Sequence, residues 1–151
     1  RMADFYLNSQ WLPSDKVPYW DFNANQVGYK PGKRSSASKV PVMYRDASAA
    51  AVTASALFEL NTYCKGEKAK KYLEAAKQIV HSLSSPAYRA KEGTNANFIL
   101  MHSVGSIPHN SEIDVPLVYA DYYYVEALKR YEQLMEKKPL FDKGFEGLAT
   151  H

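Results

Sequence analysis

The fold is decided by residues 46–60, which read DASAAAVTASALFEL. Between Asp46 and Glu59 this stretch carries no charge, and small or apolar side chains would face every side of a helix built from it. A helix that is apolar all round is typical of the interior of a protein. Asp46 is a residue type that favours the N-cap position. The sequence therefore predicts a buried helix over residues 47–60, capped by Asp46.

The stretch that follows has the opposite character. In residues 67–83, a single apolar stripe alternates with lysine, glutamate, glutamine and histidine side chains that cover the other face. This pattern is typical of an outer, solvated helix. A short turn over residues 61–66, which contains Gly66, joins it to the buried helix, so the two are expected to form a helical hairpin. The stripe consists of Ala69, Tyr72, Leu73, Ala76, Ile79, Val80 and Leu83.

Two further helices are predicted near the ends of the sequence. Residues 2–12 form an amphipathic segment that stops at Pro13, and residues 117–136 follow Pro116 with an aromatic-rich first half. No stretch alternates with a period of two between hairpin turns, so the predicted fold class is all-α. The order outer, inner, outer, inner fits an arc of helical hairpins around a central axis. It fits a plain helical bundle equally well.

Composition excludes several classes of protein. The 151 residues suit one domain, and 46% of them are hydrophobic, which is ample for a core. The 19 basic and 16 acidic residues form no dominant basic block, so a strong nucleic-acid binder is not expected. No apolar run approaches the ~18–20 residues of a membrane span. Cys64 stands alone, which excludes an intrachain disulfide and a cysteine-based metal site.

Two long connections are the expected place for function. Residues 13–46 and 84–116 each exceed the ~12–15 residues usual for a structureless loop. If the helices alternate in direction, both connections emerge beside the N-termini of the inner helices. The free N–H groups and the helix dipole at these N-termini would favour the binding of a carboxylate or a sulfate between the two connections. The basic stretch over residues 30–39 is either a rim for polyanionic oligosaccharides or a solvated loop tip.

The first connection offers Trp20 and Arg45 as candidate ligand residues. Trp20 lies beside Asp21 in the run VPYWDF, and aromatic rings next to a carboxylate are common in sugar sites; Trp20 and Phe22 could also simply anchor the loop. The planar guanidinium of Arg45 could bind a uronate carboxylate in bidentate fashion, or it could pair with a carboxylate of the protein.

The second connection and the last helix offer His102 and Asp121. His102 ends an apolar run and is either a buried, hydrogen-bonded histidine or a ligand of a substrate hydroxyl. Asp121 lies on nearly the same helix face as Leu128, and an inward carboxylate is either a structural strut or a binding group. No ligand spacing supports a metal site, and no nucleophile-elbow motif supports Ser/His/Asp catalysis.

Three motifs in this order resemble one family. They are PYWDF (residues 18–22), YRDASAAA (residues 44–51), and LMHSVG (residues 100–105) leading to DVPLVYADYYYVEAL (residues 114–128). The order resembles the C-terminal part of glycoside hydrolase family 88, the unsaturated glucuronyl hydrolases. The resemblance implies that residues 1–151 are part of a single (α/α)6 catalytic domain. The helix that starts at Arg1 without a capping residue also suggests a fragment, whose cut faces are expected to self-associate.

The resemblance implies a substrate and a reaction. The substrate is a lyase-generated oligosaccharide ending in a Δ4,5-unsaturated uronic acid, whose double bond is hydrated with help from an aspartic acid and without a metal or an organic cofactor. The catalytic aspartates are expected in the family's N-terminal half, so this stretch alone is expected to be inactive, and it supplies Trp20, Arg45, His102 and Asp121 to the pocket. The alternatives are an unsaturated rhamnogalacturonyl hydrolase and a non-catalytic module that binds glycan or protein.

Overall fold

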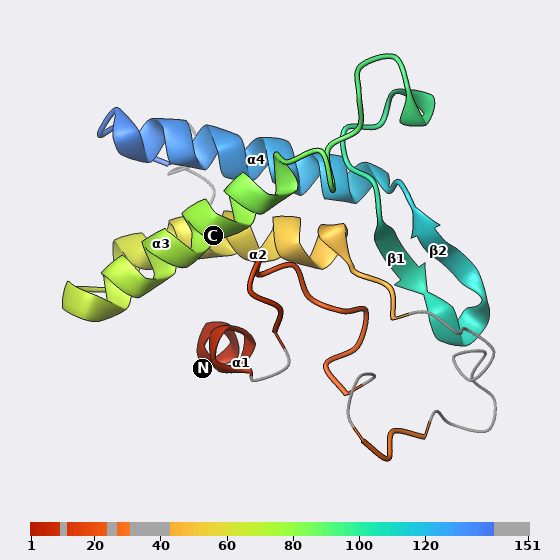
Figure 1. Cartoon of the computed structure of the whole chain (residues 1–151). Coiled ribbons are helices and arrows are strands. Elements are labelled where there is room, and N and C mark those ends of the chain that lie inside the picture. Colours follow the sequence, from red (N-terminus) through yellow and green to blue (C-terminus); the bar gives the residue numbers. More distant parts are fainter. Residues whose placement is uncertain (10–11, 24–26, 31–42, 141–151) are drawn as a thin grey trace, which may run out of the picture.

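The structure is a computed structural model that describes residues 1–9, 12–23, 27–30 and 43–140. At its centre lies the predicted hairpin, formed by α2 (Ala47–Leu60) and α3 (Gly66–Leu83) (Figure 1). Asp46 caps α2, because its carboxylate accepts hydrogen bonds from the main-chain N–H groups of Ser48 and Ala49. The predicted boundaries of α2 are confirmed, and α3 begins at Gly66, one residue earlier than predicted.

The last helix, α4 (Val118–Met135), packs against α2. Figure 1 shows both helices running in the same direction, with α3 antiparallel to them. The expected alternation of direction is therefore present in these three helices. Their contact faces form most of the core, which contains the fully buried side chains of Leu57, Phe58, Tyr72, Ile79 and Leu83.

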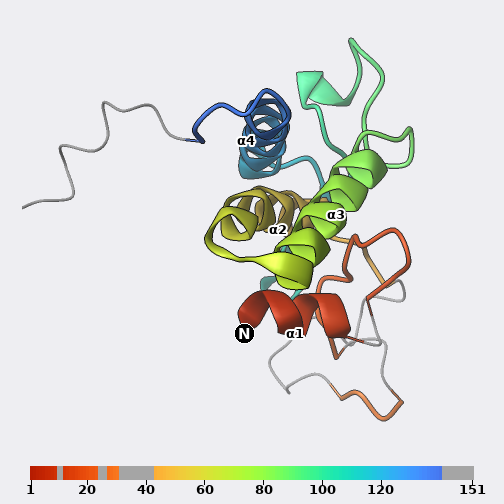
Figure 2. The same ribbon diagram turned by 90° about the vertical axis from the view of Figure 1, so that its left-hand side faces the viewer.

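The first helix differs from the prediction in length and direction. Helix α1 (Met2–Asn8) ends before Ser9, whose backbone is extended, rather than continuing to residue 12. It is seen end-on in Figure 1 and side-on in Figure 2, so it lies across α2, α3 and α4 instead of alongside them. Asp4 fixes it to α3, because the Tyr72 hydroxyl donates a 2.8 Å hydrogen bond to this carboxylate. Tyr6 is the buried residue of the helix, whereas Met2 and Phe5 are exposed.

A small antiparallel sheet is the element that the sequence pattern did not predict. Strands β1 (Ser103–Ser106) and β2 (Ser111–Val115) pair within the second long connection. Four residues in left-handed backbone, His102, Asn110, Glu112 and Asp114, lie in or beside this hairpin. These conformations interrupt regular alternation, which explains why a search for period-two patterning missed the strands.

Helix α2 is less completely covered than its composition predicted. Ala50, Ala54 and Phe58 are fully buried against its neighbours, but Val52 and Ala56 are exposed on the opposite side of the helix. In the part of the chain that the structure describes, this apolar face of α2 is therefore exposed to solvent. Within this part, no helix is both long and apolar enough to cross a lipid bilayer.

The two long connections meet at one end of the helices. In Figure 1 the described parts of both connections lie at the end where α2 and α4 begin. The prediction that both connections emerge beside the starts of α2 and α4 is thus confirmed. Most of the basic stretch over residues 30–39 lies outside the described residues.

Candidate functional site

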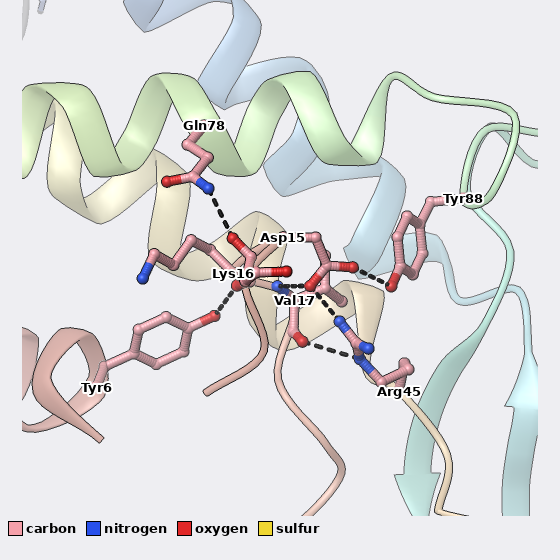
Figure 3. A network of polar contacts seen from close by, with 8 residues as sticks. Tyr6, Asp15, Lys16, Val17, Arg45, Gln78 and Tyr88 are labelled. Carbon is pink, nitrogen blue, oxygen red and sulfur yellow. Dashed lines mark hydrogen bonds and ion pairs between the residues drawn. The ribbon is translucent and has the colours of Figure 1, made fainter. Parts of the chain in front are cut away.

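Arg45, just before α2, is bound by the protein itself. Its guanidinium forms an ion pair with Asp15, and its Nε atom donates a 2.9 Å hydrogen bond to the carbonyl oxygen of Val17 (Figure 3). The guanidinium also lies over the Tyr19 ring, 5.2 Å from the ring centre. Arg45 therefore pairs with a carboxylate of the protein, which was one of the two expectations for it, and it holds the first connection against the start of α2.

Asp15, like its partner Tyr88, is a residue of this site that sequence reasoning missed. Besides Arg45, its carboxylate accepts a 2.9 Å hydrogen bond from the Tyr88 hydroxyl and a 3.2 Å bond from the main-chain N–H of Val17. Burial raises the pKa of Tyr88, and the hydrogen bond to Asp15 raises it further. The hydrogen bond that the Asp15 carboxylate accepts from the N–H two residues later forms a local Asx-type turn. Asp is a residue type that favours such turns, and this preference is the signal in the sequence that could have pointed to Asp15.

The N-terminus of α2 is occupied by the protein rather than open to an anion. Asp46 binds two of the first N–H groups of the helix, and the Ala47 N–H donates a 3.0 Å hydrogen bond to the carbonyl oxygen of His102. The same carboxylate accepts hydrogen bonds from the Ser48 hydroxyl and from the Val104 N–H. The prediction that free N–H groups at this helix start would attract a carboxylate or sulfate is therefore wrong for α2, because its own cap and His102 satisfy them.

Trp20 lies beside Arg45 in the fold. Its main-chain N–H donates a 3.1 Å hydrogen bond to the Tyr44 carbonyl oxygen, and the neighbouring Tyr19 forms an isolated antiparallel bridge with Arg45. The Trp20 side chain is half-buried and makes an edge-to-face contact with the Tyr29 ring, with 6.5 Å between the ring centres. The indole is thus placed at the edge of the site and retains exposed surface.

His102 is half-exposed rather than buried. Its Nδ1 atom lies 2.8 Å from a carboxylate oxygen of Asp114, and 44% of the side chain is accessible. The ring also meets Tyr88 edge to face at 6.4 Å between centres. Because Tyr88 bonds to Asp15, a continuous set of contacts runs from Arg45 through Asp15 and Tyr88 to His102.

Asp121 acts as a structural strut in α4. Its two carboxylate oxygens accept hydrogen bonds of 2.8 Å from the main-chain N–H groups of Ile99 and Leu100. Of the two alternatives expected for this carboxylate, these contacts match the strut, because both donors are backbone groups of the second connection. Asp121 thereby fixes the segment that leads into His102.

The four candidates thus gather at one end of the molecule but play different parts. Trp20, Arg45 and His102 surround the start of α2, and Asp121 lies one turn into α4 and anchors the chain just before His102. Trp20 and His102 offer accessible surface to a ligand. Across the described ranges, no three His, Cys, Asp or Glu side chains come together in a way that could hold a metal ion.

Known proteins similar to this chain are named unsaturated glucuronyl hydrolase or unsaturated chondroitin disaccharide hydrolase. An unsaturated glucuronyl hydrolase of Formosa agariphila is 47% identical over 135 residues, which are 89% of this chain and 30% of that protein. The crystal structure of an unsaturated glucuronyl hydrolase specific for heparin matches 93% of this chain and 34% of its own, with a TM-score of 0.74 and 46% identity. No protein-family model matches the sequence.

A third match carries a bound saccharide. It is an aspartate-to-asparagine variant of the Streptococcus agalactiae unsaturated glucuronyl hydrolase in complex with dGlcA-GalNAc6S, 29% identical, with a TM-score of 0.68 over 86% of this chain and 31% of that one. The chain spans about 30% of the length of the relatives that it matches. Its helical-hairpin architecture is the one that the resemblance predicted. In sequence and in fold, the chain is similar to part of the unsaturated glucuronyl hydrolases.

Proposed function

We propose that the chain is the C-terminal part of a single (α/α)6 catalytic domain that removes Δ4,5-unsaturated glucuronic acid from lyase-generated oligosaccharides. The observation that carries the proposal is the 47% identity to the Formosa agariphila enzyme over 89% of the chain. The likeness in fold at a TM-score of 0.74 supports it independently of the motifs. The remainder of the enzyme and the unsaturated oligosaccharide are the partners that this function requires.

The proposed reaction is the hydration of an enol ether. A carboxylic acid protonates C4 of the C4=C5 double bond while water adds to C5, and the hemiketal so formed opens and releases the next sugar. The acid must stay protonated near neutral pH, which requires a pKa raised by a partly desolvated pocket. We assign this acid to the part of the enzyme that this chain does not include, so the isolated chain is expected to show no turnover.

The four candidate residues divide into two pairs in this proposal. Trp20 stacks on a face of the sugar, and His102 accepts a hydrogen bond from a sugar hydroxyl, because both keep accessible side-chain surface. Arg45 and Asp121 hold the two connections in place, because their charged groups are engaged with Asp15 and with the backbone of Ile99 and Leu100. No residue of this chain is assigned to the proton transfer.

A chimera tests the proposal. The matched 135 residues of the Formosa agariphila enzyme are replaced by those of this chain, and turnover is followed as loss of the ultraviolet absorbance of the conjugated double bond. We expect the chimera to act on unsaturated glucuronyl disaccharides and Trp20→Ala to raise its KM. A folded chimera that turns over no unsaturated disaccharide would contradict the proposal. Turnover of unsaturated rhamnogalacturonyl substrates alone would replace it with the related activity.

A further inference from the structure

The backbone around His102 is fixed on both sides. The N–H of Met101 donates a 2.8 Å hydrogen bond to the Tyr88 carbonyl oxygen, and the His102 carbonyl oxygen accepts the bond from the Ala47 N–H. Between these anchors His102 has a φ of 62°, a left-handed conformation that is uncommon for a residue with a side chain. Such a conformation persists only where the surrounding contacts impose it, and it is enriched at functional sites.

The imidazole ring is fixed as well. Asp114 lies on β2 next to Val115, which pairs with Ser103, so the hairpin brings the carboxylate across to His102. The distance from Nδ1 to the Asp114 oxygen is 2.8 Å, and Asp114 itself has a left-handed φ of 55°. The Tyr88 ring supports the imidazole from another side. A ring held in this way presents its second nitrogen, Nε2, in a defined orientation.

We propose that Asp114 is a positioning residue that fixes His102 in the Nδ1–H tautomer, so that Nε2 is an unprotonated hydrogen-bond acceptor for a sugar hydroxyl. An ionised carboxylate can only accept hydrogen bonds, so the neutral imidazole nitrogen that faces it must carry the proton. The other nitrogen then has a lone pair directed away from Asp114. The choice of a sugar hydroxyl as the donor rests on the proposed function, whereas the tautomer does not.

Nitrogen-15 NMR of the full 151-residue chain tests the tautomer without any substrate. Long-range imidazole spectra are recorded at a pH high enough that the ring carbon shifts no longer change, and His102→Gln identifies the signals. We expect a protonated Nδ1 and an unprotonated Nε2. His109 is an internal reference, because its Nδ1 lies 2.7 Å from the Ser106 hydroxyl, which can donate or accept. An Nε2–H form or a doubly protonated ring at His102 would overturn the proposal.

Variants of Asp114 test its role. Asp114→Asn offers an amide N–H to the imidazole, so the Nε2–H population of His102 is expected to rise while the His109 signals stay unchanged. Asp114→Glu keeps the carboxylate and is expected to keep the Nδ1–H form. Glu112→Gln on the same strand removes a carboxylate of the hairpin and serves as the matched control. An unchanged tautomer in folded Asp114→Asn would overturn the proposal, and the wild-type spectra decide the tautomer even if that variant does not fold.

The chimera connects the tautomer to the saccharide. Asp114→Asn is expected to raise KM about three- to tenfold with a smaller change in kcat, as for the loss of one neutral hydrogen bond. Glu112→Gln should leave both constants unchanged. If wild-type His102 is in the Nδ1–H tautomer but Asp114→Asn leaves KM unchanged, the proposal that His102 accepts a hydrogen bond from a sugar hydroxyl is overturned. An inactive wild-type chimera would contradict the proposed function instead, while the NMR result would still stand.

Discussion

Asp15 and Arg45, 30 positions apart in the sequence, form an ion pair that joins the first long connection to the start of α2 (Figure 3). The Arg45 side chain is 25% exposed and the Asp15 side chain 35%, so water screens the pair only in part. Since Asp15 also binds Tyr88, a single carboxylate connects three segments of the chain.

Asp15→Asn is expected to destabilise the chain by about 1–3 kcal/mol, because it weakens hydrogen bonds to a charged partner and leaves Arg45 without its carboxylate. Asp21→Asn is the control, since the Asp21 carboxylate accepts a hydrogen bond from the N–H of Asn23 in an exposed turn, and it should cost less than about 0.5 kcal/mol. Urea unfolding measures both. Equal losses in the two variants would contradict the central role of Asp15.

Asp121→Asn is expected to loosen the second connection. An asparagine can accept with only one side-chain oxygen, so either Ile99 or Leu100 loses its acceptor. We expect faster hydrogen exchange at these two amides and a loss of about 1–3 kcal/mol. The matched control is Glu132→Gln, an exposed position on the same helix, where both amides should exchange as in the wild type. Unchanged hydrogen exchange at these two amides in Asp121→Asn would contradict the role of Asp121 as a strut.

Arg130 holds α4 to α2. Its side chain is 13% exposed and lies 3.0 Å from Glu59 and 3.6 Å from Glu126, and it donates a 2.9 Å hydrogen bond to the Ser55 carbonyl oxygen. Arg130→Ala brings two carboxylates together without their cation, and we expect a loss of about 2–3 kcal/mol in urea unfolding. Lys129→Ala, next to it and 64% exposed, should cost less than about 0.5 kcal/mol. If Arg130→Ala and Lys129→Ala lower the free energy of unfolding by similar amounts, the ion pairs of Arg130 with Glu59 and Glu126 add no stability of their own.

Stability is expected to fall above pH 10. Burial raises the pKa of Tyr6 and of Tyr88 above the ordinary tyrosine value of 10.0. The folded state therefore keeps protons that the unfolded chain loses, so this contribution is complete below pH 10 and disappears as the pH rises. Tyr6→Phe should lower the slope of stability against pH in this range, by up to about 1.4 kcal/mol per pH unit. An identical slope in urea unfolding series would contradict the assignment.

An exposed apolar groove on α4 predicts self-association of the isolated chain. Val118, Tyr122 and Val125 line it and are 72%, 61% and 50% exposed. Sedimentation velocity should show mass that increases with protein concentration, because exposed apolar patches of this kind bury themselves against one another. Val125→Lys should reduce the effect, whereas Val27→Lys, at a fully exposed loop position, should not. A clean monomer at all concentrations would contradict the prediction.

The helices could be predicted because their signals are local. The charge-free run of α2, the single apolar stripe of α3 and the Asp46 cap are properties of residues within a few turns of one another. The hairpin of β1 and β2 could not be predicted in the same way. Its shape depends on left-handed backbone at His102 and Asp114. His and Asp adopt such conformations more often than most residues, but only in a small share of cases, so their presence in a sequence does not locate them.

The sequence by itself determined the type and order of the helices, the end at which the long connections emerge, and the similarity to unsaturated glucuronyl hydrolases. Only the tertiary structure decided the partners of the polar groups there. Arg45 meets Asp15, Asp121 meets the backbone of Leu100, and His102 meets Asp114. The physical reason is that helix formation and capping depend on neighbours in the sequence, whereas each of these contacts depends on how separate segments pack.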